Sequence, residues 1–302
     1  MTLIRFSKYL RDRFFERVQR IPLHAGFTCP NRDGLLGVDG CIFCDNASFN
    51  SAVLQKTSIE QQMIQGMEWA WRRYGANKYL AYFQTYSNTY GSLNVIKSRY
   101  MEALKFPGVV GLMIGTRPDC LTPEIVNWLC ELSSRWMIWI ELGVQSCHDE
   151  TLHRINRGHS WRDVELAVDM IRGQVQELND ENSVKLAAHV ILGLPGETRE
   201  MILQTADSLR RLSFDGIKLH HLHAVKGTRL AEMFMSGQWQ PLSVREYVSL
   251  AAAFLTRLPD PCVVMRLVGD CPEKYLIAPH WELKKAHIEA AIWAEYERMV
   301  KQ

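Results

Sequence analysis

Residues 108–143, "GVVGLMIGTRPDCLTPEIVNWLCELSSRWMIWIELG", decide the fold class of this 302-residue chain. The runs 108–116 and 136–143 are rich in apolar and β-branched residues, which is typical of buried strands. Between them, 122–134 has helical apolar spacing and opens on Thr122, a residue type that caps helices. A strand, a helix and a second strand in this order predict two parallel strands joined by a crossover helix.

The same unit recurs along the chain. The six predicted strands are 18–25, 78–84, 108–116, 136–143, 184–192 and 214–222. The predicted helices are 58–74, 93–104, 122–134, 160–177 and 198–212, with further helical patterns over 227–257 and 281–300 and a candidate seventh strand at 262–268. Six strand–helix units fit either an open doubly wound sheet or a partial barrel, and both place their chemistry at the carboxyl ends of the strands.

Composition indicates an ordinary globular protein, because 47% of residues are hydrophobic and 23% are charged. The net charge of +2 is too small to indicate a nucleic-acid or membrane partner. Residues 1–20 nevertheless hold six basic side chains against Asp12 and Glu16, which predicts either a solvated helix face or contact with an anionic partner.

Targeting signals and cysteine usage bear on the compartment. We expect a cytoplasmic protein without membrane association, because no charged leader with an apolar core opens the chain and no apolar run reaches ~18 residues. Eight cysteines in such a chain indicate reduced thiols rather than a disulfide framework.

Polar residues gather at the ends of the predicted strands, where both candidate folds are open. These candidates are Cys29, Cys41, Cys44, Tyr86, Ser87, Asn88, Thr89, Arg117, Asp119, Cys120, Glu141, Gln145, Ser146, Cys147, Gly193–Glu197, His220, His221 and His223. Glu141 lies in a run of Trp, Met and Ile, so its carboxylate needs a fixed partner. A ribose diol or a neighbouring arginine would meet that need. His221 and His223 have the opposite strand parity from His220, so the two sets face opposite sides of the sheet.

Three metal hypotheses compete for Cys29, Cys41 and Cys44. A zinc site would use them with His24 as fourth ligand. A redox dithiol would use only Cys41 and Cys44, which leaves the third cysteine idle. A 4Fe-4S cluster takes thiolate ligands, and three of them would leave one iron open to another molecule.

The sequence resembles the radical S-adenosylmethionine (SAM) superfamily, specifically its YhcC/YtqA-like group, which is related to the Elongator-type core. The segments that carry this resemblance are AGFTCPNRDG, GCIFCD, YFQTYSNTY, IGTRPDCL, ELGVQSCHDETLHRINRGH, HVILGLPGE and KLHHLHAVKGT. The cysteines are spaced Cys-x11-Cys-x2-Cys, whereas the commonest superfamily pattern has three residues in the first gap. The longer gap is similar to that of the YhcC-type and Elongator-type subgroups.

The resemblance implies a fold and two cofactors. The fold is an α/β partial (β/α)6 TIM-type barrel over 18–257, with a helical segment over 1–17 and an extension over 258–302 that packs on the core. Cys29, Cys41 and Cys44 would ligate a 4Fe-4S cluster whose open iron binds SAM. One electron would then cleave SAM to methionine and a 5′-deoxyadenosyl radical, which abstracts hydrogen from the substrate.

Further site residues follow from the resemblance. Ser87, Asn88 and Thr89 replace the segment that binds the SAM amine, and Glu141 with Gln145 would bond the ribose. Ile191 and Gly193 belong to a segment that packs against adenine, although its glycines equally suit a tight turn. Cys120 is a candidate catalytic thiol, and an unreactive buried cysteine is the alternative.

The resemblance also suggests a reaction and partners. A reductant such as flavodoxin or ferredoxin would supply the electron. We expect tRNA, modified at the wobble uridine, to be the substrate, with a small molecule or a protein as alternatives. Acetyl transfer is not expected, because 302 residues leave no room for the acetyltransferase domain of Elongator-type relatives. A non-catalytic, zinc-stabilised β/α binding protein is the rival from another class. No oligomeric state is predicted.

Overall fold

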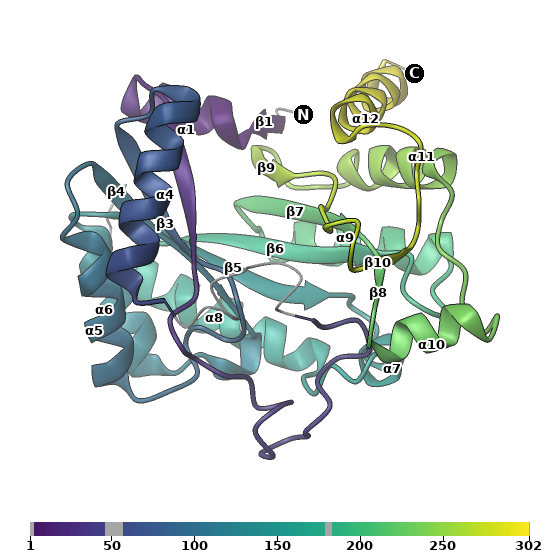
Figure 1. Cartoon of the computed structure of the whole chain (residues 1–302), viewed down its shortest axis with the longest axis horizontal. Coiled ribbons are helices and arrows are strands. Elements are labelled where there is room, and N and C mark those ends of the chain that lie inside the picture. The colour runs from purple at the N-terminus through teal and green to yellow at the C-terminus, as the bar shows by residue number, and fades with distance from the viewer. Residues whose placement is uncertain (1–2, 46–56, 179–182, 302) are drawn as a thin grey trace.

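The computed structural model describes residues 3–45, 57–178 and 183–301. Its centre is one eight-stranded sheet in the order β1-β9-β7-β6-β5-β4-β3-β2. Every neighbouring pair in this sheet runs parallel. The sheet curls into an open half-barrel with helices on its outer face (Figure 1), so the predicted partial barrel is confirmed.

All six predicted strands are present. The strands of the large sheet are β1 (Leu3–Arg5), β2 (Val18–Leu23), β3 (Lys78–Phe83), β4 (Val109–Thr116), β5 (Met137–Gln145), β6 (Lys185–Leu192), β7 (Gly216–His221) and β9 (Cys262–Arg266). β9 confirms the candidate seventh strand. A separate antiparallel pair joins β8 (Ala224–Val225) to β10 (Leu276–Ala278).

The predicted helices are also present, with one division. The helices are α1 (Phe6–Phe14), α4 (Ile59–Tyr74), α5 (Leu93–Leu104), α6 (Pro123–Ser133), α7 (Asp149–Arg154), α8 (Trp161–Leu178), α9 (Arg199–Arg211), α10 (Arg229–Met235), α11 (Val244–Leu255) and α12 (Lys285–Val300). The pattern over 227–257 forms two helices, because Ser243 starts α11 anew through a capping box with Glu246. Among the residues described, no helix has the length and apolar character to cross a membrane.

The sheet draws strands from all three predicted parts of the chain. β1 comes from the segment 1–17, which was predicted as a helix and in fact starts with a strand before α1. β9 comes from the segment 258–302 and pairs with both β1 and β7. The boundaries 1–17, 18–257 and 258–302 remain a prediction.

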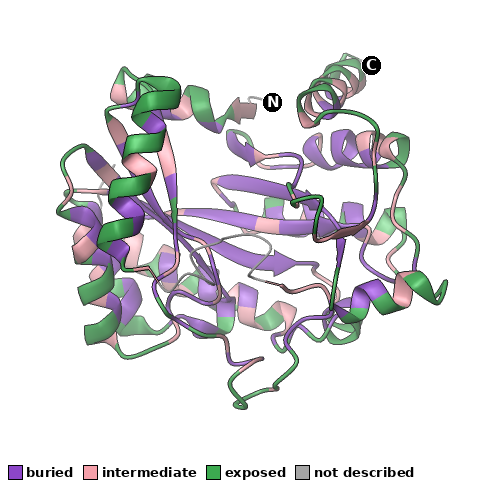
Figure 2. Cartoon of the chain, viewed as in Figure 1, coloured by how far each residue is buried: buried purple, intermediate pink, exposed green. Residues whose placement is uncertain are grey.

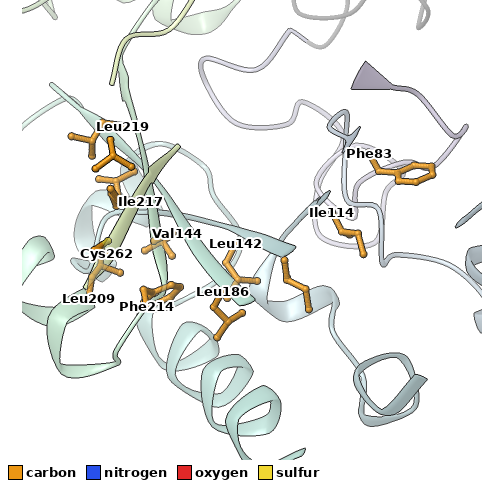
Figure 3. Packing of buried hydrophobic residues seen from close by; sticks show 14 of the residues in the cluster. Phe83, Ile114, Leu142, Val144, Leu186, Leu209, Phe214, Ile217, Leu219 and Cys262 are labelled. Atoms are coloured by element: carbon orange, nitrogen blue, oxygen red, sulfur yellow. The ribbon is translucent and has the colours of Figure 1, made fainter. Parts of the chain in front are cut away.

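The main core lies between the sheet and its outer helices. Figure 3 shows Ile114, Leu142 and Val144 of the sheet in this layer together with Phe214, and all four side chains are buried. Figure 2 shows the strands almost wholly buried, whereas the helices expose their outer faces. Apolar burial of this kind is the main stabilising contribution to such a fold.

The inside of the barrel is solid at its amino-terminal end. Trp139 of β5 is fully buried there and meets Phe6 and Tyr9 of α1 edge-on, at ring-centroid distances of 5.8 and 5.6 Å. Gly216 of β7 leaves room for the indole, since a Cβ at that position would lie 2.9 Å from it. α1 therefore closes the bottom of the barrel.

Glu141 follows Trp139 by two residues on the same face of β5 and lies in a buried ionic cluster. Its carboxylate accepts hydrogen bonds from Lys218 Nζ at 2.6 Å and from the Tyr82 hydroxyl at 3.0 Å. The predicted fixed partner exists, but the neighbouring cation is a lysine rather than an arginine. Burial lowers the pKa of Lys218 to about 7, even though Glu141 opposes that shift. Removing one partner from such a pair leaves the other charge buried alone.

Lys218→Met is therefore expected to lower the free energy of unfolding by about 3–5 kcal/mol, and the double variant Glu141→Gln/Lys218→Met to recover most of that loss. Urea unfolding of the cofactor-free chain measures both. Lys8→Met is the matched control, because the Lys8–Asp12 pair is exposed and such pairs contribute less than about 1 kcal/mol. Equal losses for Lys218→Met and Lys8→Met would contradict this view of the buried pair.

Candidate functional site

A cavity of about 170 Å³ lies in the mouth of the barrel. Its walls come from the loop after β2 and from the carboxyl ends of β3, β4, β5, β6, β7 and β9. Glu141 and Lys218 line it from the barrel side. The cavity is therefore where the strand-end rule for parallel α/β folds places a site.

The three clustered cysteines all line this cavity. Their loop is tied to the segment after α7, because Asn31 Nδ2 donates to the Asn156 carbonyl at 2.6 Å and Asn156 Nδ2 donates to the Gly40 carbonyl at 2.7 Å. The Ile42 amide also donates to the Ile155 carbonyl at 3.1 Å. These bonds hold the long gap between the first and second cysteines against the barrel.

The three cysteines are better suited to binding metal ions as thiolates than to lying close together without a metal. Burial raises the pKa of the Cys44 thiol to about 11, and the nearby Cys41 thiol adds to the shift. Several thiolates at this spacing need a cation to offset their repulsion, and iron in a 4Fe-4S cluster supplies it. Across the described ranges, no three His, Cys, Asp or Glu side chains are grouped to hold a single ion. The ligands of a four-iron cluster bind different irons and need not converge on one point.

His24, the fourth ligand in the zinc hypothesis, is engaged elsewhere. Its Nδ1 lies 2.9 Å from Thr85 Oγ1, and its amide donates to Gln62 Oε1 at 2.7 Å. It is not among the residues that line the cavity.

Four of the residues predicted to contact SAM line the cavity, namely Ser87, Glu141, Gln145 and Ile191. Gln145 Oε1 is buried there and accepts no hydrogen bond from any described residue. Gln145 and Tyr86 also adopt left-handed backbone conformations, with φ of 68° and 64°. Strained backbone and an unsatisfied buried oxygen at one cavity are features of a binding site.

Three other residues predicted to contact SAM lie outside the cavity lining. Asn88 Nδ2 donates to three backbone carbonyls and so shapes the turn after β3. Thr89 Oγ1 donates to the Cys120 carbonyl at 2.7 Å. Gly193 has φ +90°, and its carbonyl accepts a bond from Trp239 Nε1 at 3.0 Å. Their visible roles are structural, and their contact with SAM remains a prediction.

Cys120, the candidate catalytic thiol, is buried behind the cavity rather than on its wall. Burial, with the Asp119 carboxylate as second cause, raises the pKa of Cys120 to about 12. The thiol is therefore protonated at neutral pH. Its catalytic role stays a prediction.

The cavity also contains residues that the sequence reasoning missed, among them Lys218, His189 and Arg266. The sequence contained a signal for Lys218 and His189, because each interrupts an otherwise apolar strand, as Glu141 does in β5. His220 faces the cavity, whereas His221 stacks on Trp281 with ring centroids 4.2 Å apart. The predicted split that sets His220 apart from His221 and His223 is wrong, because β7 ends at His221 and the His223 ring lies 4.8 Å from that of His220 and 4.1 Å from that of His221.

Comparisons with known proteins place this chain in a family. The model described as "Radical SAM superfamily" matches residues 28–209, and the model described as "Radical_SAM C-terminal domain" matches residues 214–298. Protein YhcC of Escherichia coli K12 is 36% identical over 277 residues, which cover 91% of this chain and 86% of YhcC.

More distant relatives include the tRNA uridine(34) acetyltransferase of Methanocaldococcus infernus, 25% identical over 63% of this chain and 33% of the relative. The solved structure of M. infernus Elp3 with an N-terminal deletion shares the fold, with a TM-score of 0.70 at 18% identity. That match covers 94% of this chain and 64% of the Elp3 chain.

The family implies a 4Fe-4S cluster and SAM as cofactors. The family match favours the hypothesis of a 4Fe-4S cluster over the hypothesis of a non-catalytic zinc-binding protein, because the radical SAM superfamily consists of enzymes. The chain belongs to the radical SAM superfamily of enzymes, in the group that contains YhcC.

Proposed function

We propose that this chain cleaves SAM reductively at a 4Fe-4S cluster held by Cys29, Cys41 and Cys44. The observation that carries the proposal is that all three thiols line one cavity at the mouth of a radical SAM barrel. When bound, the cluster and SAM supply a 5′-deoxyadenosyl radical that abstracts a hydrogen atom from the substrate. A one-electron reductant such as flavodoxin or ferredoxin is the proposed electron donor.

The chain's own residues position and shield this chemistry. Gln145 Oε1 is free to accept a hydrogen bond from a ribose hydroxyl or an ammonium group. Glu141 is the second group proposed to accept a hydrogen bond from the ribose, and the bonds from Lys218 and Tyr82 hold its carboxylate in place. Phe43 and Ile191 contribute apolar walls that exclude water from the reacting atoms.

We propose tRNA as the substrate, modified at the wobble uridine. One support is the distant relative named tRNA uridine(34) acetyltransferase. The other is a groove of about 580 Å³ along β2 and β9, lined by Arg5, Arg11, Arg17, Arg20, Arg266 and Lys285. Arg266 lines both this groove and the cysteine cavity. A strand of RNA in the groove would therefore lie beside a residue that also lines the cavity.

The groove also offers aromatic rings beside its cations. The Arg17 guanidinium lies 3.8 Å from the Tyr74 ring centroid, and the Arg5 guanidinium lies 4.8 Å from that of Trp293. Cations with flat aromatic faces suit phosphates and bases together. The basic residues of the amino-terminal segment have two different surroundings. Lys8 forms an exposed ion pair with Asp12 on a solvated helix face, whereas Arg11 and Arg17 line the groove. Small molecules and proteins remain the alternative substrates.

The cofactor proposal predicts a brown protein with about four irons and four sulfides per chain after anaerobic purification, since each cluster holds that number. Once reduced, it is expected to form 5′-deoxyadenosine from SAM. Cys41→Ala removes one ligand and should abolish both properties. Cys271→Ala is the matched control, because this thiol lies outside the cavity. Colourless protein with stoichiometric zinc and no SAM cleavage would refute the proposal.

The tRNA proposal predicts that Arg11→Gln and Arg17→Gln each weaken binding of total tRNA and reduce the slope of log affinity against log salt by about one. Filter binding over a salt series measures both quantities. Arg162→Gln on the exposed face of α8 is the control and should bind as the wild type does. An unchanged modified-nucleoside profile in tRNA from cells lacking the protein would favour a small-molecule or protein substrate instead.

A further inference from the structure

Two of the cavity cysteines each meet an arginine from a different segment of the chain. Arg117, just after β4, places Nη1 3.8 Å from the Cys29 sulfur. Arg157, after α7, places Nη1 3.6 Å from the Cys41 sulfur. Both guanidinium groups line the cavity, and both arginines are more than nine-tenths buried. Each contact joins residues more than 80 positions apart, so the barrel itself brings them together.

The third cysteine has an arginine on its own loop. Arg32 donates to the Cys44 carbonyl. Arg32 also lines the cavity together with Cys44. The cavity is thus lined by one arginine near each of its three cysteines, and by Arg266 as well.

These arginines are held in place by the fold. Arg157 Nη2 donates to the Gly143 carbonyl at 2.8 Å, and a Cβ at Gly143 would collide with that nitrogen. Arg32 lies across Gly40 in the same way, because a Cβ there would lie 2.8 Å from Nε. Glycine at both positions allows the close approach. A guanidinium in a fixed position cannot swing away when the charge of its surroundings changes.

Among the described residues, neither Arg32 nor Arg157 forms an ion pair with a carboxylate, and Arg157 is the more deeply buried of the two. Arg117 forms a bidentate pair with Asp119, with bonds of 2.9 and 2.6 Å. For Arg157, no ion pair with a carboxylate is found among residues 3–45, 57–178 and 183–301, and its buried Nε finds no acceptor there. Arginine remains protonated in proteins, so this is a permanent positive charge beside Cys41.

We propose that Arg32, Arg117 and Arg157 are positioning residues that raise the reduction potential of the cluster, with Arg157 contributing most. The proposal rests on the proposed function, since it takes the three cysteines as cluster ligands. Reduction adds one electron to the cluster and breaks no bond, so the product carries one more negative charge. Fixed cations and hydrogen bonds to the ligand sulfurs stabilise that product over the oxidised form. The electron comes from the external reductant.

The test is a redox titration of the iron-loaded enzyme without SAM, with dithionite as reductant and the electron paramagnetic resonance signal of the reduced cluster as readout. At a fixed potential, Arg157→Gln is expected to lower the ratio of reduced to oxidised cluster at least tenfold, which equals 59 mV for a one-electron couple. Arg157→Lys keeps the charge and is expected to change the ratio less than threefold. Arg162→Gln changes the net charge equally at an exposed site and is expected to match the wild type.

The other outcomes are decisive as well. A ratio for Arg157→Gln that equals the Arg162→Gln ratio overturns the proposal, as does an equal shift in Arg157→Gln and Arg157→Lys. An unchanged potential with weakened SAM binding assigns Arg157 to the cofactor instead. If Arg157→Gln loses iron, Arg32→Gln provides the same measurement beside Cys44. Iron and sulfide analysis of the wild type comes first, so failure of the proposed function is recognised before any potential is measured.

Discussion

Trp139 fills the barrel at its amino-terminal end, and the position of this one indole determines where the molecule is solid and where it is hollow. Side chains alternate across a strand, so the residues that share the inner face of β5 with Trp139 are Met137, Glu141, Gly143 and Gln145. Along this face the residues change from apolar at Met137 and Trp139 to charged at Glu141. They are small at Gly143, where the cavity opens. Phe6 and Tyr9 pack against the indole from below, and the cavity in the mouth of the barrel lies on the cysteine side.

Charge is arranged in two levels above that apolar base. The lower level is the Glu141–Lys218 pair with the Tyr82 hydroxyl, whose members compensate one another. The upper level contains arginines beside thiols, of which Arg117 is paired with Asp119 whereas Arg157 has no carboxylate partner among the described residues. Burying a charge is costly unless it is paired. This excess of cations is consistent with a cavity built for a negatively charged group.

Much of this architecture could be predicted from the sequence, and the failures have physical reasons. Long apolar runs such as 136–143 revealed their strands, whereas Leu3–Arg5 is too short to show a period. The division of 227–257 into two helices depends on the capping box of Ser243 and Glu246, which apolar periodicity does not reveal. Polarity at strand ends located the cavity, but it could not distinguish Gln145, which faces inward, from Asn88, which bonds to the backbone. Lys218 was missed because pairing between distant strands is a property of the folded sheet.

The pairing of β1 with β9 has a consequence for how the protein is made. From β2 to β7 each new strand joins the edge formed by the one before it, so the sheet grows in the order of synthesis. β1 is the exception, because Leu3–Arg5 pairs only with Cys262–Val264. On the ribosome this strand emerges long before its partner and must wait for residue 264, whereas α1 can already pack on Trp139 of β5. The pairing of β1 is thus one of the last contacts of the sheet to form.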